Sequence, residues 1–339
     1  MVKAKKFVLV EYFHGELKAT DLQLVEEELP PLKNGEYLAE AEFLSVDPYM
    51  RAGSNELPRG ITMVGQQIAK IIESKNPEFP VGKRVIGYMG WRTHTIVNQE
   101  EFAKPETMNL LPIILPDIEE YSPSLGLGAL GIIGNTAYFG LLDICTPKKG
   151  ETLVVSGAAG AVGSHVGQIG KHVVGMYVIG IAGSDEKCKW LVNKLGFDHA
   201  INYKTEDVGA ALIKAAPKGV DVYFDNVGGE ISSTVIRQMK LFGRISVCGS
   251  ISVYNSDFSA LPKASVVQFF VMKKQLKMEG FFVTRWNDHW MEGIKKNLQW
   301  IREGKIKSRE TITKGFENMF EAFINMLRGK IIGEAIVQV

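Results

Sequence analysis

Two patterns of hydrophobic and polar residues divide the chain. In the first third, apolar and polar residues alternate over short runs, most clearly at Leu38–Leu44 and more loosely at 66–73 and 84–88. Such alternation predicts half-buried β-strands. Three prolines within the segment 109–123 exclude a long helix there, so we expect this segment to cross from one domain to the next.

From Gly150 onward, short apolar runs alternate with segments of helical periodicity. The strands expected from these runs are 153–155, 177–182, 199–202, 220–225 and 244–248, and the helices between them are 161–172, 185–195, 206–216 and 231–239. This βαβα alternation predicts a parallel, doubly wound sheet. Two amphipathic helices follow, around 294–301 and 316–327, and the last apolar run, 335–337, predicts a strand that could return to the first domain.

The pattern therefore predicts an α/β protein of two domains. A mainly-β domain covers 1–122 and is completed by about 312–339, and the doubly wound domain covers 123–311. The length of 339 residues fits two domains, and 45% hydrophobic with 23% charged residues is a globular composition.

The charge balance excludes several kinds of partner. Lys and Arg number 39 against 38 Asp and Glu, so there is no net field to attract nucleic acid. No apolar run approaches the 18 or more residues of a membrane span, and Phe7–Val10 is too short for the apolar region of a signal peptide. We expect a cytoplasmic protein with neither nucleic acid nor membrane as a partner.

The cysteines and histidines do not form a recognisable metal motif. Cys145, Cys188 and Cys248 contain no C-x-x-C spacing, and the six histidines include no H-E-x-x-H sequence. Neither a disulfide framework nor a thiolate zinc cluster follows from such spacing. We expect no metal, and we interpret the cysteines as small buried apolar residues.

A glycine-rich turn after the expected strand 153–155 is the strongest local signal. Gly160 and Gly163 occupy the second and third glycine places of G-x-G-x-x-G, with Ala158 at the first. Small residues at the start of a helix let backbone N–H groups approach a pyrophosphate, whose charge the helix dipole favours. The alternative is a glycine turn kept for helix–sheet packing. The predicted phosphate-binding residues are Ala159, Gly160, Ala161, Val162 and Gly163.

The end of the next strand indicates which dinucleotide binds. An NAD site usually has an acid about 20 residues further on, where it holds the ribose hydroxyls. The stretch 182–187 has no acid at the strand tip, and Lys187 could meet a 2′-phosphate. We therefore predict NADP(H). In the alternative interpretation, Ser184 or Asp185 caps the next helix and Lys187 is solvated.

Five motifs in order carry a resemblance to a known family. They are Val46–Arg51, Ala158–Gly163, Gly183–Lys187, Phe224–Gly229 and Cys248–Asn255. Through them the chain resembles, over essentially its full length, the zinc-independent medium-chain dehydrogenase/reductases of the prostaglandin reductase group. The resemblance implies a GroES-like, mainly-β catalytic domain and a Rossmann NADP-binding domain.

The zinc ligands of the metal-dependent relatives are missing. Where those relatives have a ligand cysteine just before an aspartate, and a Gly-His-Glu, this chain has Ser45-Val46-Asp47 and Gly65-Gln66-Gln67. Zinc assists alcohol oxidation by stabilising an alkoxide. Hydride addition to an α,β-unsaturated carbonyl forms a delocalised enolate instead, which a few hydrogen-bond donors can stabilise.

The resemblance thus implies NADPH-dependent reduction of the α,β-double bond of enals and enones, with lipid enones such as 15-oxo-prostaglandins as substrates. It also implies oxidation of leukotriene B4 with NADP+. Two other readings stay open, an NADPH quinone reductase and an NADPH-binding protein without turnover. Both a monomer and a homodimer fit the sequence.

The resemblance also assigns residues to the cofactor. Lys187 matches the 2′-phosphate contact, and Tyr203 and Asn226 match further NADP contacts. The resemblance also places a loop beside the nicotinamide, and a strand whose backbone contacts the nicotinamide amide. These residues are Cys248, Gly249, Ser250, Ile251, Ser252, Val253 and Tyr254 for the loop, and Phe281, Phe282 and Val283 for the strand. Near the C-terminus, Ile331 stands where the family has asparagine, so one side-chain contact to the cofactor is lost or replaced by backbone.

Three residues are candidates for catalysis. Tyr254 follows the fifth strand at the carboxyl edge of the sheet, where its phenol could donate to an enolate or protonate it, unless it only packs there. Tyr49 is expected to line the substrate pocket. Arg51 is the third candidate, although Asp47 and Arg51 could instead cap a short turn and pair with each other.

Overall fold

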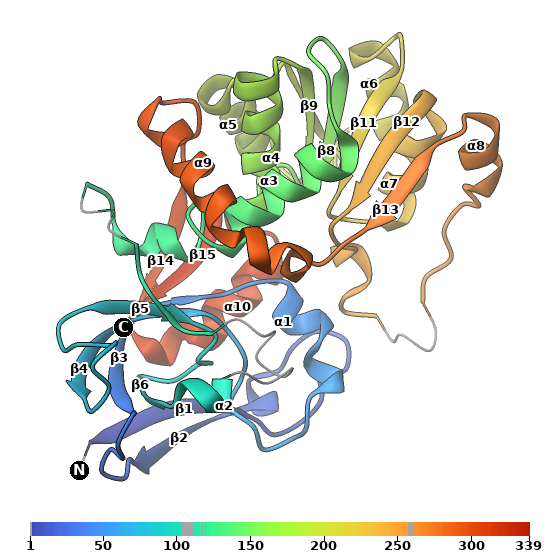
Figure 1. Cartoon of the computed structure of the whole chain (residues 1–339). Coiled ribbons are helices and arrows are strands. Elements are labelled where there is room, and N and C mark those ends of the chain that lie inside the picture. The colour runs from blue at the N-terminus through green and yellow to red at the C-terminus, as the bar shows by residue number, and fades with distance from the viewer. Residues whose placement is uncertain (1, 103–110, 117, 119, 257–260) are drawn as a thin grey trace. The chain divides into compact units, whose positions relative to one another are not determined.

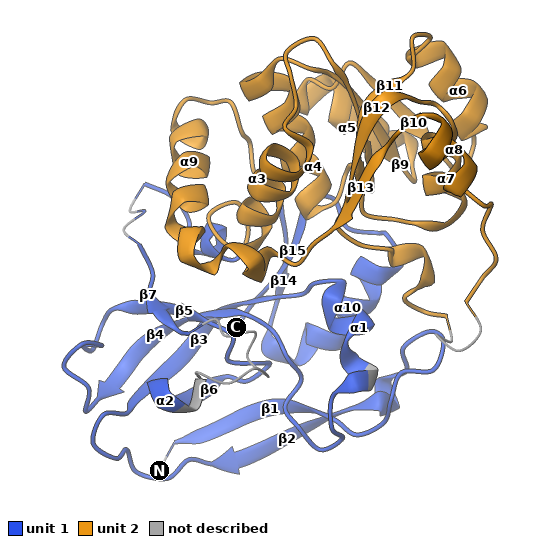
Figure 2. Cartoon of the chain, turned by 45° about the vertical axis from the view of Figure 1, so that its right-hand side comes forward, with its two compact units in different colours: residues 1–127, 310–339 blue, residues 128–309 orange. Residues whose placement is uncertain are grey.

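The computed structural model describes residues 2–102, 111–116, 118, 120–256 and 261–339. It divides the chain into two compact units, which Figure 2 distinguishes by colour. Unit 1 comprises 1–127 and 310–339, and unit 2 comprises 128–309. The predicted segment 109–123 lies at the end of the first part of unit 1, and its residues 109, 110, 117 and 119 are outside the described residues.

Unit 2 is built on a parallel sheet (Figure 1). In the described part of the chain its six strands follow the order β10-β9-β8-β11-β12-β13. Their bounds are β8 Thr152–Ser156, β9 Tyr177–Ala182, β10 His199–Asn202, β11 Val220–Asp225, β12 Met239–Val247 and β13 Lys277–Gly280. In sequence order this is 3-2-1-4-5-6, the doubly wound arrangement, whose switch point lies between β8 and β11. The predicted α/β fold class is confirmed.

Helices cover both faces of this sheet because successive strand residues point to opposite sides. Leu153 and Val155 of β8 join the core beneath one set of helices, while Val154 joins the core beneath the other. The first set comprises α3 Ile132–Cys145, α4 Ala161–Gln168, α5 Asp185–Leu195 and α9 Trp290–Arg302. The second comprises α6 Val208–Ala215, α7 Gly229–Arg237 and α8 Gln268–Lys273.

Helix α3 is the main element of unit 2 that the sequence pattern did not indicate. Eleven of its fourteen residues are buried. A helix that is apolar on nearly every side has no polar stripe, and therefore no amphipathic period to detect. The predicted helix 161–172 also differs in detail, since α4 ends at Gln168 and a π-helical turn, Ile169–Val174, continues it.

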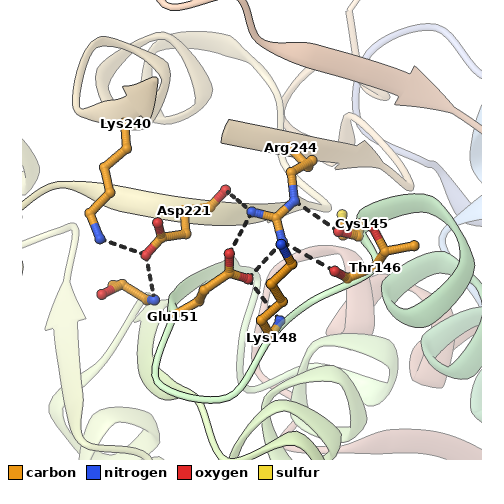
Figure 3. A network of polar contacts seen from close by, with 8 residues as sticks. Cys145, Thr146, Lys148, Glu151, Asp221, Lys240 and Arg244 are labelled. Atoms are coloured by element: carbon orange, nitrogen blue, oxygen red, sulfur yellow. Dashed lines mark hydrogen bonds and ion pairs between the residues drawn. The ribbon is translucent and has the colours of Figure 1, made fainter. Parts of the chain in front are cut away.

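A polar network fastens the end of α3 to the sheet (Figure 3). Arg244 of β12 donates to the carbonyls of Cys145 and Thr146, where α3 ends in a left-handed Thr146 with φ of 41°. The same guanidinium forms two hydrogen bonds with the Glu151 carboxylate, at 3.0 and 2.6 Å. Asp221 of β11 joins the network by pairing with Lys240 at 2.7 Å. The network therefore links a helix terminus to two neighbouring strands.

Unit 1 contains a mixed sheet and a separate β1–β2 hairpin. Over the described residues, the sheet path is β14-β15-β3-β4-β5-β7, with β6 pairing β3. The bounds are β1 Lys3–Leu9, β2 Leu22–Glu28, β3 Tyr37–Ser45, β4 Gln67–Ser74, β5 Arg84–Gly87, β6 His94–Val97, β7 Ile113–Ile114, β14 Glu310–Lys314 and β15 Glu334–Gln338. The helices are α1 Tyr49–Ala52, α2 Gln99–Phe102 and α10 Met319–Leu327.

The last strand of the chain completes the sheet of unit 1. β15 pairs antiparallel with β3, and β14 pairs parallel with β15. The expectation that the final apolar run returns to the first domain is thus confirmed. α10 covers this part of the sheet and buries Met319, Ala322 and Phe323 in the core shared with β1 and β3. Among the described residues, no helix has both the length and the apolar character needed to cross a bilayer.

Candidate active site

The glycine-rich turn after β8 has the geometry of a phosphate-binding loop. Gly157 begins the turn with φ of 61°, a conformation that suits glycine. A Cβ on Gly163 would lie 2.4 Å from the Gly157 carbonyl oxygen, so only glycine lets α4 approach the turn this closely. Ala158 keeps the first place of the motif spacing, and Gly157, directly before it, supplies the positive φ of the tight turn.

Helix α4 begins directly at this turn. Gly160 precedes its first residue, and the Ser164 N–H bonds back to the Gly160 carbonyl at 3.0 Å. The N–H groups of Ala161, Val162 and Gly163 belong to the first helical turn, where no intrahelical acceptor exists. Such a helix start favours a bound anion, and it lies at the switch point of the sheet.

The end of β9 leads directly into the capped start of α5. Ser184 caps α5 by accepting a hydrogen bond from the Lys187 N–H at 3.2 Å, as the capping interpretation predicted. Asp185 accepts a hydrogen bond from the Asn202 amide at 2.7 Å. Its carboxylate is thus engaged in holding β10.

Two lysines interact at this strand end. Burial, and next the positive charge of Lys204, lower the pKa of the Lys187 ammonium. A bound dianion would offset both effects, because it stabilises the charged form of each lysine. No sequence pattern indicated Lys204, because its proximity to Lys187 depends on the pairing of β9 with β10.

Tyr203 lies between these lysines in sequence and is 44% exposed. A Cβ on Gly183 would lie 3.0 Å from the Tyr203 ring, so the ring packs against the bare backbone of the strand end. Gly183 therefore permits an exposed aromatic ring beside the capped start of α5.

The end of β11 is held by the buried carboxylate of Asp225. Its Oδ1 accepts hydrogen bonds from the hydroxyls of Ser156 and Tyr223 and from the N–H groups of Val227 and Gly228. The Asn226 amide donates to the Ser156 carbonyl at 2.8 Å. These bonds join the ends of β8 and β11, and they leave the Asn226 amide oxygen available as an acceptor.

The loop 248–254 packs against the same turn. The N–H groups of Cys248 and Gly249 donate to the Asp225 carbonyl, and those of Ile251 and Ser252 donate to Asn226 and Val227. Burial raises the pKa of the Cys248 thiol to about 12, so this cysteine is neutral at physiological pH. The loop is thus a backbone platform at the carboxyl edge of β11 and β12.

Tyr254 ends this loop with a fixed hydroxyl. Its oxygen accepts a hydrogen bond from the Ser250 N–H at 3.2 Å. A Cβ on Gly249 would lie 2.9 Å from the same oxygen, so this glycine makes room for the phenol. Burial is the main cause that raises the pKa of Tyr254. The phenol therefore keeps its proton at neutral pH and can donate it.

The segment 281–283 continues from β13. Phe281 packs on Phe224 and Trp286, and Val283 is buried, whereas Phe282 is 79% exposed. Because Val283 is buried and Phe281 packs against the core of unit 2, the backbone of these two residues suits the predicted contact to a cofactor.

Tyr49 belongs to a separate polar cluster in unit 1. Its ring stacks near that of Tyr88, with centroids 6.2 Å apart. Its buried hydroxyl has no hydrogen-bond partner at normal geometry, although the hydroxyls of Tyr88 and Ser45 are close enough to influence it. Burial raises the pKa of Tyr49 well above its ordinary value, with smaller effects from Tyr88 and Asp47. The hydroxyl therefore stays protonated.

Asp47 and Arg51 do not form the predicted cap and ion pair. Pro48 precedes α1 without a side-chain cap, and Asp47 Oδ2 has no hydrogen-bond partner. Arg51 instead donates to the carbonyls of Phe13 and Gly15 at 3.2 and 3.1 Å. Its side chain reaches away from Asp47 and fastens the segment after β1, while its catalytic role stays a prediction.

The residues at the zinc positions of the metal-dependent relatives do not fit zinc. Ser45 and Gln66 are buried and offer a hydroxyl and a carboxamide in place of a thiolate and an imidazole. Within the described ranges, no three His, Cys, Asp or Glu side chains are grouped so that they could hold a metal ion. The three cysteines are free thiols.

Comparison with known proteins gives matches along the whole chain. Residues 5–104 match the family described as the N-terminal domain of oxidoreductase, and residues 161–300 match the family described as zinc-binding dehydrogenase. Prostaglandin reductase 1 from Oryctolagus cuniculus is 50% identical over 99% of this chain and 93% of that protein. The NADPH-dependent curcumin reductase of Escherichia coli is 37% identical over 99% of this chain and 96% of that protein.

A solved structure also matches this chain over nearly its whole length. CurA from Vibrio vulnificus in complex with NADPH is 37% identical and has a TM-score of 0.90, with 99% of each chain covered. The similarity therefore extends over both units and over all the elements described above.

Proposed function

Because the chain belongs to the zinc-independent medium-chain dehydrogenase/reductases of the prostaglandin reductase type, we propose that it reduces the α,β-double bond of enals and enones with NADPH. The observation that carries the proposal is the hydroxyl of Tyr254, which the Ser250 N–H orients at the carboxyl edge of β12. A protonated phenol at that edge suits a reaction that develops an enolate, and Ser45 and Gln66 offer no zinc ligand for an alkoxide.

In this proposal the carboxyl ends of β8, β9 and β11 hold NADPH. The N-terminus of α4, with Ala159, Gly160, Ala161, Val162 and Gly163, holds the pyrophosphate. Lys187 and Lys204 would hold the 2′-phosphate, and Tyr203 would provide a further contact to the cofactor. The Asn226 amide oxygen accepts from a cofactor hydroxyl, and the backbone of 248–254 and 281–283 faces the nicotinamide.

When bound, NADPH supplies the hydride that the β-carbon of the substrate receives. The negative charge then moves to the carbonyl oxygen of the substrate, which becomes an enolate oxygen. Tyr254 donates a hydrogen bond to that oxygen, and Ser250 keeps the phenol in place because its N–H occupies the phenol oxygen. One oriented donor of this kind is worth about 2.7 to 4 kcal/mol in the transition state.

The substrate class follows from the relatives and from the chemistry of the site. Lipid enones, including 15-oxo-prostaglandins, present a conjugated carbonyl on a long apolar chain, and Tyr49 is the residue that we propose for the lining of the substrate pocket. Arg51 contributes indirectly, since it holds the segment 13–15 in place. We propose oxidation of leukotriene B4 with NADP+ as a second activity, in which the carbon that bears the hydroxyl gives up hydride, the hydroxyl gives up its proton to solvent, and the alcohol becomes a ketone.

The wider setting is part of the proposal. We place the protein in the cytoplasm, with unit 1 as the catalytic domain and unit 2 as the NADP-binding domain. Ile331 packs its side chain in the core of unit 1, which agrees with a backbone contact to the cofactor at this position. Both a monomer and a homodimer are compatible, and β13 at the edge of the unit 2 sheet is a possible contact surface for a homodimer.

The test is a comparison of substrates with purified protein. NADPH consumption is measured with a 2-alkenal, a 15-oxo-prostaglandin and a quinone, and binding of NADPH is measured separately. We expect turnover with the first two and slower turnover with the quinone. Faster turnover of the quinone would support a quinone reductase, and tight NADPH binding with no turnover would support a binding protein. Either result would refute the proposal.

A further inference from the structure

Three carboxyl groups lie in a row across neighbouring strands of unit 1. Glu310 of β14 is the direct partner of Glu334 of β15 in their parallel ladder. Ile336 pairs with Ser45 in the antiparallel ladder of β15 and β3, and continuing that register by two residues places Glu334 opposite Asp47. The N–H of Val46 donates to the Ala335 carbonyl at 3.1 Å, as this register requires. We call Glu310, Glu334 and Asp47 the carboxyl row.

Asp47 and Glu334 of the carboxyl row are buried and Glu310 is half-buried, and the row has no compensating cation among the described residues. Glu334 is 2% exposed, and neither of its side-chain oxygens has a hydrogen-bond partner. Glu310 Oε1 and Asp47 Oδ2 also lack partners. Arg309, the cation next to Glu310 in sequence, lies over the Trp190 ring. In the described part of the chain no Lys, Arg or His pairs with a member of the row, so adjacent charges there would repel each other.

Protons are the remaining means of neutralising the row. Burial raises the pKa of Glu334 well above its ordinary value, followed by the charges of Asp47 and Glu310, and burial also raises the pKa of Glu310. At each of the two outer carboxyls of the row, a serine hydroxyl opposes the rise in pKa. Ser124 donates to Glu310, and Ser45 lowers the pKa of Asp47, which burial raises to about 6. Besides burial, the negative charge of Asp47 raises the pKa of the Tyr49 and Tyr88 phenols.

The row lies where the chain passes between the two units. The first part of unit 1 ends at Leu127, and its second part begins at Glu310. Ser124, three residues before the first passage, donates to Glu310 Oε2 at 2.8 Å. The Thr311 hydroxyl donates to the Ile332 carbonyl at 3.0 Å and adds a tie from β14 to the segment before β15. Both connections to unit 2 are thus fastened to each other through Glu310.

We propose that Glu310 and Glu334 share a proton at neutral pH and that this proton holds β14 against β15, so that its loss releases β14. The carboxyl row then acts as a pH-sensitive element at the base of both connections, a role beyond the reductase activity. A carboxyl whose pKa is raised in the folded state contributes less stability as the pH rises from its ordinary pKa toward the raised value. The contact between β14 and β15 therefore weakens in alkaline solution.

Hydrogen exchange tests this without substrate or cofactor. Amide exchange of the β14 segment, 310–314, is followed from pH 6 to pH 9, corrected for the intrinsic rate, and compared with that of β4 in the same unit. In the wild type we expect protection of 310–314 to fall by about tenfold per pH unit once the shared proton begins to leave, while β4 changes little. Equal pH dependence of the two segments would overturn the proposal, whatever the behaviour of any variant.

Substitutions identify the proton. Glu334→Gln keeps the shape of the side chain and a hydrogen-bond donor, but glutamine cannot ionise. The amide protection of 310–314 in this variant should therefore not change with pH, and we expect the same for Glu310→Gln. Glu317→Gln, at an exposed acid of the same unit, is the matched control and should retain the wild-type dependence. Ser124→Ala removes the tie to the first connection and should increase exchange of 310–314 at every pH. A wild-type pH dependence in both Glu334→Gln and Glu310→Gln would refute the assignment.

Discussion

Replacing Lys187 by glutamine should change the choice between NADPH and NADH. Glutamine keeps much of the length of the side chain and removes only its charge. A hydrogen bond to a charged group contributes about 1.5 to 3 kcal/mol, and each 1.4 kcal/mol corresponds to about a tenfold change in affinity. Since Lys204 still provides a second positive charge near Lys187, we expect the lower part of that range. The KM for NADPH should rise about 10- to 30-fold.

The assay compares steady-state kinetics with both cofactors at saturating enone. The KM for NADH should change by less than about twofold, because NADH has no 2′-phosphate for Lys187 to bind. Lys189→Gln is the matched control, since Lys189 is an exposed lysine of the same helix and should leave both KM values unchanged. Equal losses for NADPH and NADH, or equal effects of the two substitutions, would refute the assignment of the 2′-phosphate to Lys187.

The pH dependence offers a second check on the same site. Binding of the 2′-phosphate needs the charged form of Lys187, which is present below its pKa. Burial and the Lys204 charge lower that pKa, so the preference for NADPH over NADH should decline at a lower pH than for an exposed lysine. In Lys187→Gln this decline should be much weaker.

Four further predictions follow from the contacts described. Tyr254→Phe should lower kcat about 100-fold and leave the NADPH dissociation constant unchanged, because only the donor to the enolate is lost; an unchanged kcat would show that another group stabilises the enolate. Gly163→Val should abolish NADPH binding measured by calorimetry, since even a Cβ would lie 2.4 Å from the Gly157 carbonyl oxygen, and wild-type affinity would contradict the assigned loop. Arg244→Met should lower the free energy of unfolding of unit 2 by about 3 kcal/mol in urea, because the partly buried Glu151 carboxylate and the end of α3 lose their donor. A loss below about 0.5 kcal/mol would show that the network is as weak as an exposed ion pair. Dialysis against a strong chelator should leave enone reduction unchanged, since Ser45 and Gln66 are not zinc ligands, and a loss that added zinc restores would contradict that conclusion.

The elements of unit 2 could be predicted closely where each has its own periodicity. β9, β10, β11 and α5 begin and end at the residues that the pattern indicated, because apolar runs and a Ser184 cap mark their limits. β12 begins five residues earlier than expected, at Met239. Its start is irregular, with a register shift against β11 and a Phe242 at φ of 62°, which an alternating pattern does not reveal.

Most residues of the proposed cofactor site could be named from the sequence because they are neighbours along the chain. The turn 157–163, the cap at Ser184 and the loop 248–254 each form a local motif. Lys204 was missed because it approaches Lys187 only through the pairing of β9 and β10. The comparisons confirm the family and the fold class that the five motifs implied.

The carboxyl row could not be predicted from sequence. Asp47, Glu310 and Glu334 are far apart along the chain, and each could equally have been an exposed acid. They meet because β15 pairs with β3 on one side and with β14 on the other. The periodicity of a strand or a helix describes one segment of the chain only. A contact among three distant segments depends on the order and register of the strands, which a single sequence does not show.

We propose that this chain adds hydride to a carbon–carbon double bond without a metal to stabilise an alkoxide. The most direct measurement uses NADPH that carries deuterium at the transferable position, a 2-alkenal as substrate, and NMR of the product. We expect a saturated aldehyde with deuterium on the β-carbon. An allylic alcohol with deuterium on the former carbonyl carbon would contradict the proposal.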